Sequence, residues 1–575
     1  MSATPAPDPL LSVRDLTVTV RGEAGERTLI DGVSLDLAKG EILGLVGESG
    51  SGKSLLCRAL VRLLPSRALA IAGGSVRLAG RELTTASTAE MEAVRGGAIG
   101  MIFQNPSSHL DPVMRVGDQI SEGVIFHRKL DRVAARAEAV AIMEQVGFTD
   151  PARQYSNYPH EFSGGMRQRA MIAVALACDP DILIADEPTT ALDVTIQAQI
   201  LRLLMELRER RGLSIILITH DLGVVAQTCD RIAVMRQGGV VETGAKRQIL
   251  TSPQHPYTRA LIASHPSMPV DYEASEVDDQ ASQADQAQPF APAPTPPLAP
   301  RPLVEIDDLQ VRYPVGGGVF TRRRFFSALA GVSLQIMPGE TVGIVGESGS
   351  GKSTLARAML GLSPISDGHV TFDGDSLRLT PAATLARMRR EAAMVFQDPF
   401  NSLNPRFTIG ETLAEVLRVH GKVAPSAIPA RVEELLRLVE LDPALAVRRP
   451  RQLSGGQCQR AGIARALAVD PRLIVADECV AALDVTIQAQ IVDLFRRLVA
   501  TMDLTLVFIA HDLAIVRHLC QRVVVMHHGR IVEEGPCAEV FARPREAYTA
   551  ALIAAIPDID PDRRLLMPPA SVLSS

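Results

Sequence analysis

Short runs of consecutive apolar residues alternate with helical patterns along this chain. Three such runs in the N-terminal half, Ile42–Val46, Ile182–Ala185 and Ser214–Thr219, lack the alternation of apolar and polar residues that marks a half-exposed strand. They predict buried strands of a parallel sheet that is covered on both faces. A helix is expected to begin at Lys53, shortly after the first run. The pattern therefore predicts an α/β core.

A second pattern, with helical spacing, interrupts this core. It marks one helix face in each half of the chain, formed by Val133, Ala137 and Val140 and by Val432, Leu435, Leu436 and Val439. We expect a helical subdomain to be inserted into the α/β core at these positions, once in each half.

The chain contains its own sequence twice. Residues 44–54 read GLVGESGSGKS and residues 343–353 read GIVGESGSGKS, while ALDVTIQAQI occurs at 191–200 and again at 482–491. A repeat this long indicates duplicated domains, because solenoid repeats span about 20 to 50 residues. The segment 268–302 is first acidic and then rich in proline and alanine, which favours an extended linker. The predicted domains are therefore residues 1–267 and 303–575.

Composition narrows the class of protein. The chain has 575 residues and a net charge of −6, which argues against a general affinity for nucleic acid. Its seven cysteines form no CxxC pair, so a zinc site or a disulfide framework is not expected. No apolar run approaches the roughly 20 residues of a membrane helix. We expect a soluble protein that reaches a membrane only through a partner.

Two glycine-rich segments fit the phosphate-binding pattern GxxxxGK[ST]. Each follows a predicted strand and precedes a predicted helix, which is the context that the pattern requires. Lys53 and Lys352 are expected to reach the β- and γ-phosphates of ATP, and Ser54 and Ser353 to bind Mg²⁺. The residues expected to bind ATP here are Gly47, Glu48, Ser49, Gly50, Ser51, Gly52, Lys53, Ser54, Gly346, Glu347, Ser348, Gly349, Ser350, Gly351, Lys352, Ser353 and Thr354.

A pair of carboxylates ends a buried strand in each copy. Residues 182–187 read ILIADE and residues 473–478 read LIVADE. Asp186 and Asp477 stand where the magnesium-binding aspartate of a P-loop ATPase is expected. Glu187 and Glu478 follow directly and can orient or deprotonate an attacking water.

A serine followed by two glycines opens a helical stretch in each copy. The segments are Ser163-Gly164-Gly165-Met166 and Ser454-Gly455-Gly456-Gln457. Free N–H groups at such a helix start favour an anion. By itself the pattern is weak, but its fixed distance before the carboxylate pair makes it specific.

The order of these motifs, with Gln104 and His220 in one copy and Gln397 and His511 in the other, resembles the ABC transporter ATPase family. The resemblance implies two tandem P-loop NTPase domains of α/β fold, each a mixed-sheet core with an inserted helical subdomain. It implies that the serine-glycine motif of one copy completes the ATP site of the other, so that Lys53 faces Ser454–Gln457 and Lys352 faces Ser163–Met166.

Further roles come from the same resemblance. Gln104 and Gln397 are expected to contact Mg²⁺ and relay its presence to a permease, and His220 and His511 to contact the γ-phosphate and assist catalysis. Met166 replaces the family's usual glutamine, and Cys479 replaces the usual proline after the second carboxylate pair. Neither change removes a catalytic group, so both sites are expected to be competent.

A narrower resemblance lies near the end of each copy. Residues 252–258 read SPQHPYT, with a weaker second version at 545–549, and both are similar to the tail of oligopeptide, dipeptide and nickel importer ATPases. That family implies two transmembrane permease subunits, a periplasmic solute-binding protein, no nucleic acid, and a position on the cytoplasmic face of a bacterial inner membrane. Peptides are its main solutes.

Two other classes of ABC ATPase also carry two ATPase domains (cassettes) in one chain or a large insert within a domain. A soluble translation factor of the ABC-F type would carry a long, charged, helical linker, and the acidic and proline-rich segment 268–302 does not fit one. A DNA-repair ATPase would need a long coiled coil between Ser54 and Ser163, and that interval is too short to hold one.

Overall fold

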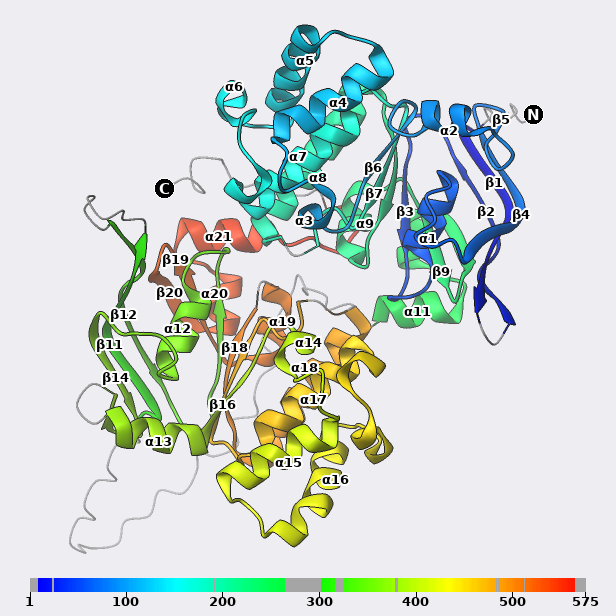
Figure 1. Ribbon diagram of the computed structural model, residues 1–575. Coiled ribbons are helices and arrows are strands. Elements are labelled where there is room, and N and C mark those ends of the chain that lie inside the picture. The colour runs from blue at the N-terminus through cyan, green and yellow to red at the C-terminus, as the bar shows by residue number, and fades with distance from the viewer. Residues whose placement is uncertain are drawn as a thin grey trace, which may run out of the picture. The chain divides into compact units, whose positions relative to one another are not determined.

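The computed structural model describes residues 9–22, 25–190, 192–263, 301–315, 324–377, 381–481, 483, 485–510 and 512–563. These residues form two compact units, one made mainly of residues 9–263 and the other mainly of residues 301–549 (Figure 1). The predicted linker lies outside the described residues except for its last two positions, and so does His511.

The first unit combines two sheets. A four-stranded antiparallel sheet has the order β2-β1-β4-β5, and a six-stranded sheet has the order β10-β9-β3-β8-β7-β6, with only β10 antiparallel to its neighbour. The strands are β1 (Leu11–Gly22), β2 (Gly25–Leu37), β3 (Ile42–Val46), β4 (Leu69–Leu78), β5 (Arg81–Glu82), β6 (Ile99–Ile102), β7 (Ile182–Asp186), β8 (Ser214–Ile218), β9 (Arg231–Arg236) and β10 (Gly239–Ala245). The three strands predicted from apolar runs are confirmed to within one residue.

Helices cover both faces of the six-stranded sheet. The helices of this unit are α1 (Lys53–Leu60), α2 (Thr88–Val94), α3 (Pro106–His109), α4 (Val116–Arg128), α5 (Arg132–Gln145), α6 (Pro151–Gln154), α7 (Gly164–Leu176), α8 (Val194–Arg211), α9 (Leu222–Thr228), α10 (Lys246–Thr251) and α11 (Pro256–Ala263). Helix α1 packs in one core with β1 and β2 and with alternate residues of β3, such as Leu43 and Leu45. Ile42 and Val46 of β3 lie on the opposite side of the strand and pack in the other core, with α7 and α8.

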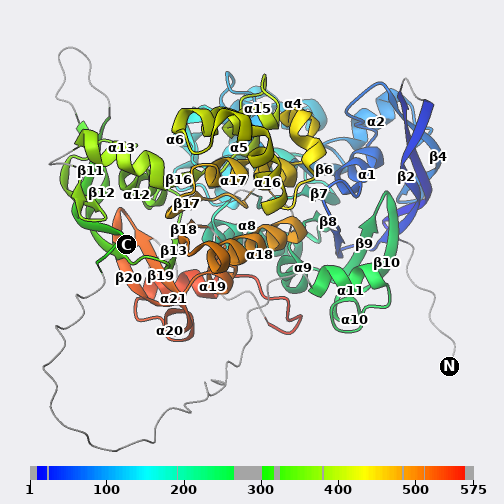
Figure 2. The same ribbon diagram turned by 90° about the horizontal axis from the view of Figure 1, so that it is seen from below.

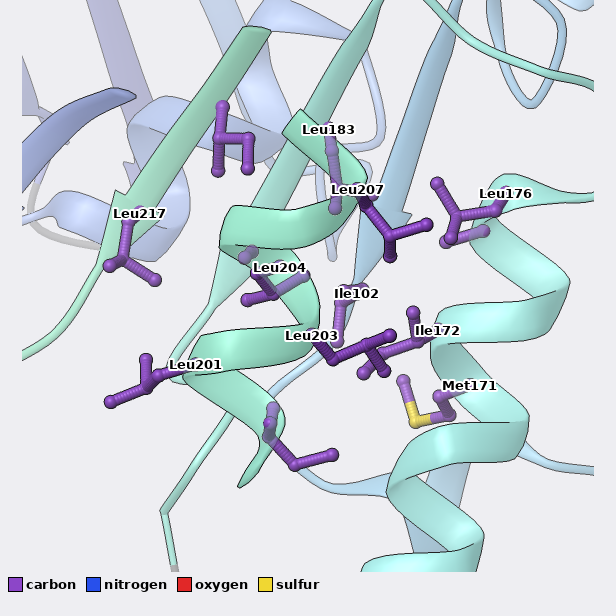
Figure 3. Packing of buried hydrophobic residues seen from close by; sticks show 14 of the residues in the cluster. Ile102, Met171, Ile172, Leu176, Leu183, Leu201, Leu203, Leu204, Leu207 and Leu217 are labelled. Atoms are coloured by element: carbon purple, nitrogen blue, oxygen red, sulfur yellow. The ribbon is translucent and has the colours of Figure 1, made fainter. Parts of the chain in front are cut away.

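This second core explains why the strands read as continuous apolar runs. Figure 3 shows α8 contributing Leu201, Leu204 and Leu207 to a layer that also contains Ile172 of α7 and Leu183 of β7. Because both faces of the sheet are buried, apolar residues are needed at odd and even positions alike. All five residues of β3, β7 and β8 are buried.

The inserted helical subdomain is confirmed, but its predicted buried face in the first unit is wrong. Helix α5 buries Ala135, Ala139, Ile142 and Met143, whereas Val133 is 81% exposed. Ala137 is exposed and Val140 is half-buried, so the predicted set does not form the packing face. The corresponding prediction in the second unit, Val432, Leu435, Leu436 and Val439, is confirmed, since all four are buried.

The second half of the chain repeats this architecture. Its sheets have the orders β12-β11-β14-β15 and β16-β17-β18-β13-β19-β20. The strands are β11 (Val304–Val315), β12 (Arg324–Ile336), β13 (Thr341–Val345), β14 (Asp367–Phe372), β15 (Asp375–Ser376), β16 (Ala392–Val395), β17 (Leu473–Asp477), β18 (Thr505–Ile509), β19 (Arg522–His527) and β20 (Arg530–Pro536). The helices are α12 (Lys352–Met359), α13 (Pro381–Glu391), α14 (Pro399–Ser402), α15 (Ile409–His420), α16 (Ile428–Leu438), α17 (Gly455–Leu467), α18 (Val485–Met502), α19 (Leu513–Leu519), α20 (Cys537–Ala542) and α21 (Ala547–Ala554).

Both units are therefore α/β folds with a mixed sheet core and a helical insertion, as the sequence predicted. A search of the described residues finds no helix with the length and apolar character that crossing a membrane requires.

Candidate active site

Each glycine loop joins a buried central strand to a helix, β3 to α1 and β13 to α12. Gly47 has φ 151° and Gly52 has φ 103°, both in the region that glycine alone adopts easily. A Cβ at Gly47 would lie 2.2 Å from the carbonyl oxygen of Met235, so no larger residue fits the loop base. Gly346 has φ 148°, and a Cβ at this position would lie at the same 2.2 Å from the carbonyl oxygen of Met526. The two loops therefore share one backbone geometry.

The loop lysines are buried and bind the loop's own carbonyl groups. The Lys53 ammonium donates to the carbonyl oxygens of Gly47 (2.7 Å) and Glu48 (2.8 Å). Lys352 makes the same contacts to Gly346 (2.7 Å) and Glu347 (2.9 Å). Both ammonium groups thus stand inside a loop whose backbone N–H groups can bind phosphate.

The serine after each lysine contacts the aspartate that ends the neighbouring strand. The Ser54 hydroxyl donates to Asp186 Oδ1 at 2.8 Å, and Ser353 donates to Asp477 Oδ1 at 2.9 Å. Asp186 is only 1% exposed. Burial raises the pKa of Asp186, and the neighbouring Glu187 carboxylate raises it further, while the bond from Ser54 lowers it. A buried carboxylate beside a hydroxyl is a fitting place for a divalent cation, whose charge would offset the burial.

The glutamate after each aspartate adopts a left-handed backbone conformation. Glu187 has φ 47° and Glu478 has φ 49°, which is uncommon for a residue with a side chain. The N–H of Glu187 donates to the carbonyl of Ile218 (3.0 Å), and the N–H of Glu478 donates to that of Ile509 (2.9 Å). This turn brings both neighbouring carboxylates to the same end of the sheet, although strand residues normally alternate sides.

The Glu187 carboxylate is surrounded by donors. Gln104 donates to it at 2.8 Å, Thr190 donates at 2.8 Å, and His220 Nδ1 lies 3.4 Å away. In the second unit Gln397 donates to Glu478 at 2.7 Å. The structure therefore brings the predicted glutamine, glutamate and histidine together in the first unit. Thr190 was missed by sequence reasoning, although it lies in the TTALD segment that follows the carboxylate pair.

Charge pairing shifts the pKa values of Glu187 and His220 in opposite directions. Burial raises the pKa of Glu187, but the hydrogen bond and charge of His220, with Thr190 and Lys53, outweigh burial and lower it to about 2. Burial lowers the pKa of His220, but the Glu187 carboxylate outweighs burial and raises it above 6.5. Glu187 is thus anionic at neutral pH.

The serine-glycine motifs begin α7 and α17. Ser163 and Ser454 are the N-cap residues, and their hydroxyls accept from the N–H groups of Met166 and Gln457, each at 3.3 Å. Next to Gly165 stands Ile196 of α8. Within the described residues, no hydrogen bond joins either motif to the glycine loop of its own unit. The predicted ATP-binding role of Ser163, Gly164, Gly165, Ser454, Gly455, Gly456 and Gln457 stays a prediction.

The two departures from the family pattern leave these contacts in place. The side chain of Gln457 also accepts from the Ser454 N–H at 3.0 Å, which Met166 cannot do for Ser163.

Cys479 is 1% exposed, and burial raises its pKa to about 12. All seven cysteines are free thiols.

We expect the pKa of His220 to fall when Glu187 is replaced by glutamine, because burial then acts without the opposing carboxylate. The raised pKa of His220 contributes stability that is complete below pH 6.5 and is lost as the pH rises through the folded-state value. The lowered pKa of Glu187 contributes stability above pH 4.5, which is lost as the pH falls toward about 2. The pair therefore stabilises the fold most between pH 4.5 and pH 6.5.

An NMR titration of the His220 imidazole, in the absence of nucleotide and metal, measures the pKa of His220 in the wild type and in Glu187→Gln. The variant His220→Gln identifies the His220 signal in the spectrum. The thermal stability lost in His220→Gln should be greater at pH 6 than at pH 9. An unchanged His220 pKa in Glu187→Gln would contradict the pairing.

Comparisons with known proteins identify the family of this chain. The family model described as "ABC transporter" matches residues 30–190 and 329–481, and the model described as "Oligopeptide/dipeptide transporter, C-terminal region" matches 241–292 and 532–572. The chain is 43% identical over 568 residues to the glutathione import ATP-binding protein GsiA of Salmonella choleraesuis, covering 96% of this chain and 90% of that protein.

A second relative is the peptidoglycan transport ATP-binding protein YejF of Agrobacterium fabrum, 42% identical over 554 residues, with 96% of this chain and 97% of the relative covered. A solved dimeric ATP-binding cassette bound to ADP and Pi is 26% identical, covers 41% of this chain and 98% of its own, and has a TM-score of 0.38. With a family model that matches both halves and relatives that match nearly the whole length, the chain belongs to the ABC transporter family, as an ATPase subunit of the oligopeptide/dipeptide importer type.

Proposed function

We propose that this chain couples Mg²⁺-dependent ATP hydrolysis to the uptake of a peptide or a related small solute. As an ABC ATPase it energises an importer, and its relatives are named for the import of glutathione and the transport of peptidoglycan. One observation supports the proposed residue roles: in both units a glycine loop, a buried aspartate and a glutamate with left-handed backbone lie at one end of the central sheet.

In the proposed ATP sites, each chain residue has one task. The loop N–H groups and Lys53 or Lys352 bind the phosphates. Ser54 and Asp186, or Ser353 and Asp477, would hold Mg²⁺ with Gln104 or Gln397, and the ion would supply charge neutralisation for the transferred phosphoryl group. The Glu187 or Glu478 carboxylate orients the attacking water and accepts its proton. His220 and His511 contact the γ-phosphate.

We further propose that each ATP site is completed by the other cassette. Lys53 would then face Ser454–Gln457, and Lys352 would face Ser163–Met166. The supporting observation is that each serine-glycine motif caps a helix whose N-terminal N–H groups can bind an anion. The proposed cassettes are residues 1–267 and 303–575, joined by the linker 268–302.

The partners of an importer ATPase include a membrane permease. We propose two transmembrane permease subunits and a periplasmic solute-binding protein, with this chain held at the cytoplasmic face of a bacterial inner membrane. A soluble ABC-F-type translation factor is not favoured, because the relatives are transport ATP-binding proteins.

Co-expression with permease subunits of the oligopeptide/dipeptide importer type from the same organism, and purification of the complex, test the proposal. In proteoliposomes, the purified complex should hydrolyse ATP at least several-fold faster when the binding protein is loaded with a transported peptide, and the peptide should accumulate only with ATP and Mg²⁺. A variant with both Glu187→Gln and Glu478→Gln is the matched control for uptake. If the chain purifies with ribosomes and no permease, the importer proposal is wrong.

A further inference from the structure

Each phosphate loop is held by a tyrosine from the C-terminal part of its own cassette. The N–H of Glu48 donates to the hydroxyl of Tyr257 at 3.0 Å, across 209 positions of sequence. The N–H of Glu347 donates to the hydroxyl of Tyr548 at 3.1 Å. Tyr257 is the second residue of α11 and Tyr548 is the second residue of α21, so the same contact is built twice from matching elements.

The contact acts on the residue that also orients the loop lysine. The N–H of Glu48 binds Tyr257, while its carbonyl accepts from Lys53 at 2.8 Å and from the N–H of Ser51 at 3.1 Å. In the second unit, Glu347 stands in the same way between Tyr548 and Lys352 (2.9 Å). When the ammonium turns toward a phosphate, the tyrosine contact is independent of that movement and can keep the peptide in place.

The tip of the loop needs such an anchor. Glu48, Ser49 and Gly50 are exposed, whereas Gly47 and Ser51 on either side of them are buried. The far side of the loop is fixed by the N–H of Gly238, which donates to the carbonyl of Ser51 at 3.0 Å. Tyr257 supplies a second anchor, on the near side of the exposed tip.

The tyrosine is itself held at two points that do not involve its hydroxyl. The Glu242 carboxylate of β10 accepts from the N–H groups of Gln254 (2.7 Å) and His255 (3.0 Å), which fixes the start of α11. The Arg236 guanidinium lies 4.8 Å from the centre of the Tyr257 ring. Figures 1 and 2 both show α11 beside β9.

The second unit supports its tyrosine in a parallel way. The Glu533 carboxylate accepts from the N–H groups of Arg545 (2.8 Å) and Glu546 (3.2 Å), and the Tyr548 ring stacks on His527 at 4.0 Å. Because ring and helix have their own supports, loss of the hydroxyl alone should leave the packing in place.

We propose that Tyr257 and Tyr548 are positioning residues for ATP, which hold the first turn of the phosphate loop in its binding geometry through the N–H groups of Glu48 and Glu347. The C-terminal region that matches the oligopeptide/dipeptide family model thereby contributes to the nucleotide site of its own cassette. This inference rests on the proposed ATP-binding role of the glycine loops. Its consequence is on nucleotide binding, because within the described residues the tyrosine hydroxyls accept from the N–H groups of Glu48 and Glu347, which lie in the loops and not at the carboxylates proposed to act on water.

The test is a variant of the full-length chain with both Tyr257→Phe and Tyr548→Phe, which removes two hydroxyls and keeps both rings. A neutral hydrogen bond has a net value of about 1 kcal/mol, so we expect the KM for ATP, and the Kd for a fluorescent ATP analogue, to rise about fivefold. The kcat should stay within about twofold of wild type, because the reacting groups are untouched.

Tyr155→Phe is the matched control. Tyr155 is also buried, and its hydroxyl contacts Ser121 (2.9 Å) and Asp118 (2.9 Å) in the helical subdomain, away from the loop. This control should leave the KM unchanged. The proposal is overturned if the double variant keeps the wild-type KM and Kd, if kcat alone falls, or if Tyr155→Phe raises the KM equally. A wild-type chain that binds no ATP would instead overturn the proposed ATP site.

Discussion

Replacing both Lys53 and Lys352 by alanine is expected to abolish the stabilisation of the protein by ATP and Mg²⁺. Each ammonium is buried and lies within 3 Å of two loop carbonyls, inside the segment that we propose to bind phosphate. A ligand at about 1,000 times its Kd stabilises a fold by about 4 kcal/mol, and this is the effect that should disappear. ATP hydrolysis should fall below detection with it. Thermal unfolding with and without MgATP measures the change.

The unfolding temperature of the lysine variant must also be measured without ATP, because both lysines donate to loop carbonyls when no nucleotide is bound. Their loss removes one donor from each of the carbonyls of Gly47, Glu48, Gly346 and Glu347, and should lower the unfolding temperature even in the absence of ATP. The ATP-dependent shift must therefore be compared within each variant. Lys39→Ala with Lys422→Ala is the matched control and should keep the full shift, since it removes one lysine from each cassette outside the glycine loops, Lys39 being exposed and Lys422 half-buried. An undiminished shift in the loop variant would remove the basis for the phosphate assignment.

The second large effect is expected from Glu187→Gln and Glu478→Gln. Together they should lower kcat by a factor of about 10² to 10⁴, the usual range for loss of a general base, while ATP binding persists. Each single variant should lower turnover to a comparable extent. The two glutamates share the left-handed turn, at φ 47° and 49°, and each accepts a hydrogen bond from a glutamine, at 2.8 and 2.7 Å.

If Glu187→Gln and Glu478→Gln lower turnover to a comparable extent, then neither Met166 nor Cys479 marks a degenerate ATP site. The serine cap of α7, which precedes Met166, has the same 3.3 Å length as that of α17, and Glu478, which precedes Cys479, has the same left-handed turn as Glu187. Neither residue therefore changes the backbone geometry of its motif. ATPase rates should be measured with the permease present, and Glu209→Gln serves as a surface control. One variant with full activity and the other with none would mean that one site is degenerate, contrary to this prediction.

The parts of the site that lie in one continuous segment could be predicted from sequence. The glycine loops and the strand-ending carboxylates carry their own signals, because φ values near 150° require glycine and buried strands require apolar runs. The carboxylate pair is more subtle. Sequence reasoning placed both side chains at the site, but the left-handed conformation of Glu187 that brings them there was visible only in the structure.

The buried face of α5 could not be read reliably from spacing. Its sequence, RVAARAEAVAIMEQ, carries apolar residues on most sides, so several sets at helical spacing compete. Neighbouring helices select among them: Ala135 and Ala139 belong to the buried core, whereas Val133 remains exposed. In α16 the apolar residues form a single stripe, and there the same reasoning succeeded.

By itself the sequence determined the duplicated α/β architecture, the two glycine loops and the residue types that gather around them, because these depend on local backbone geometry and on burial along single elements. Only the tertiary structure decided how distant residues meet. The Glu187–His220 pair and the contact of Tyr257 with Glu48 join segments that are far apart in the chain. Such contacts depend on how the strands are ordered in the sheet and on which helix packs at its edge, and no local pattern encodes a distance between segments.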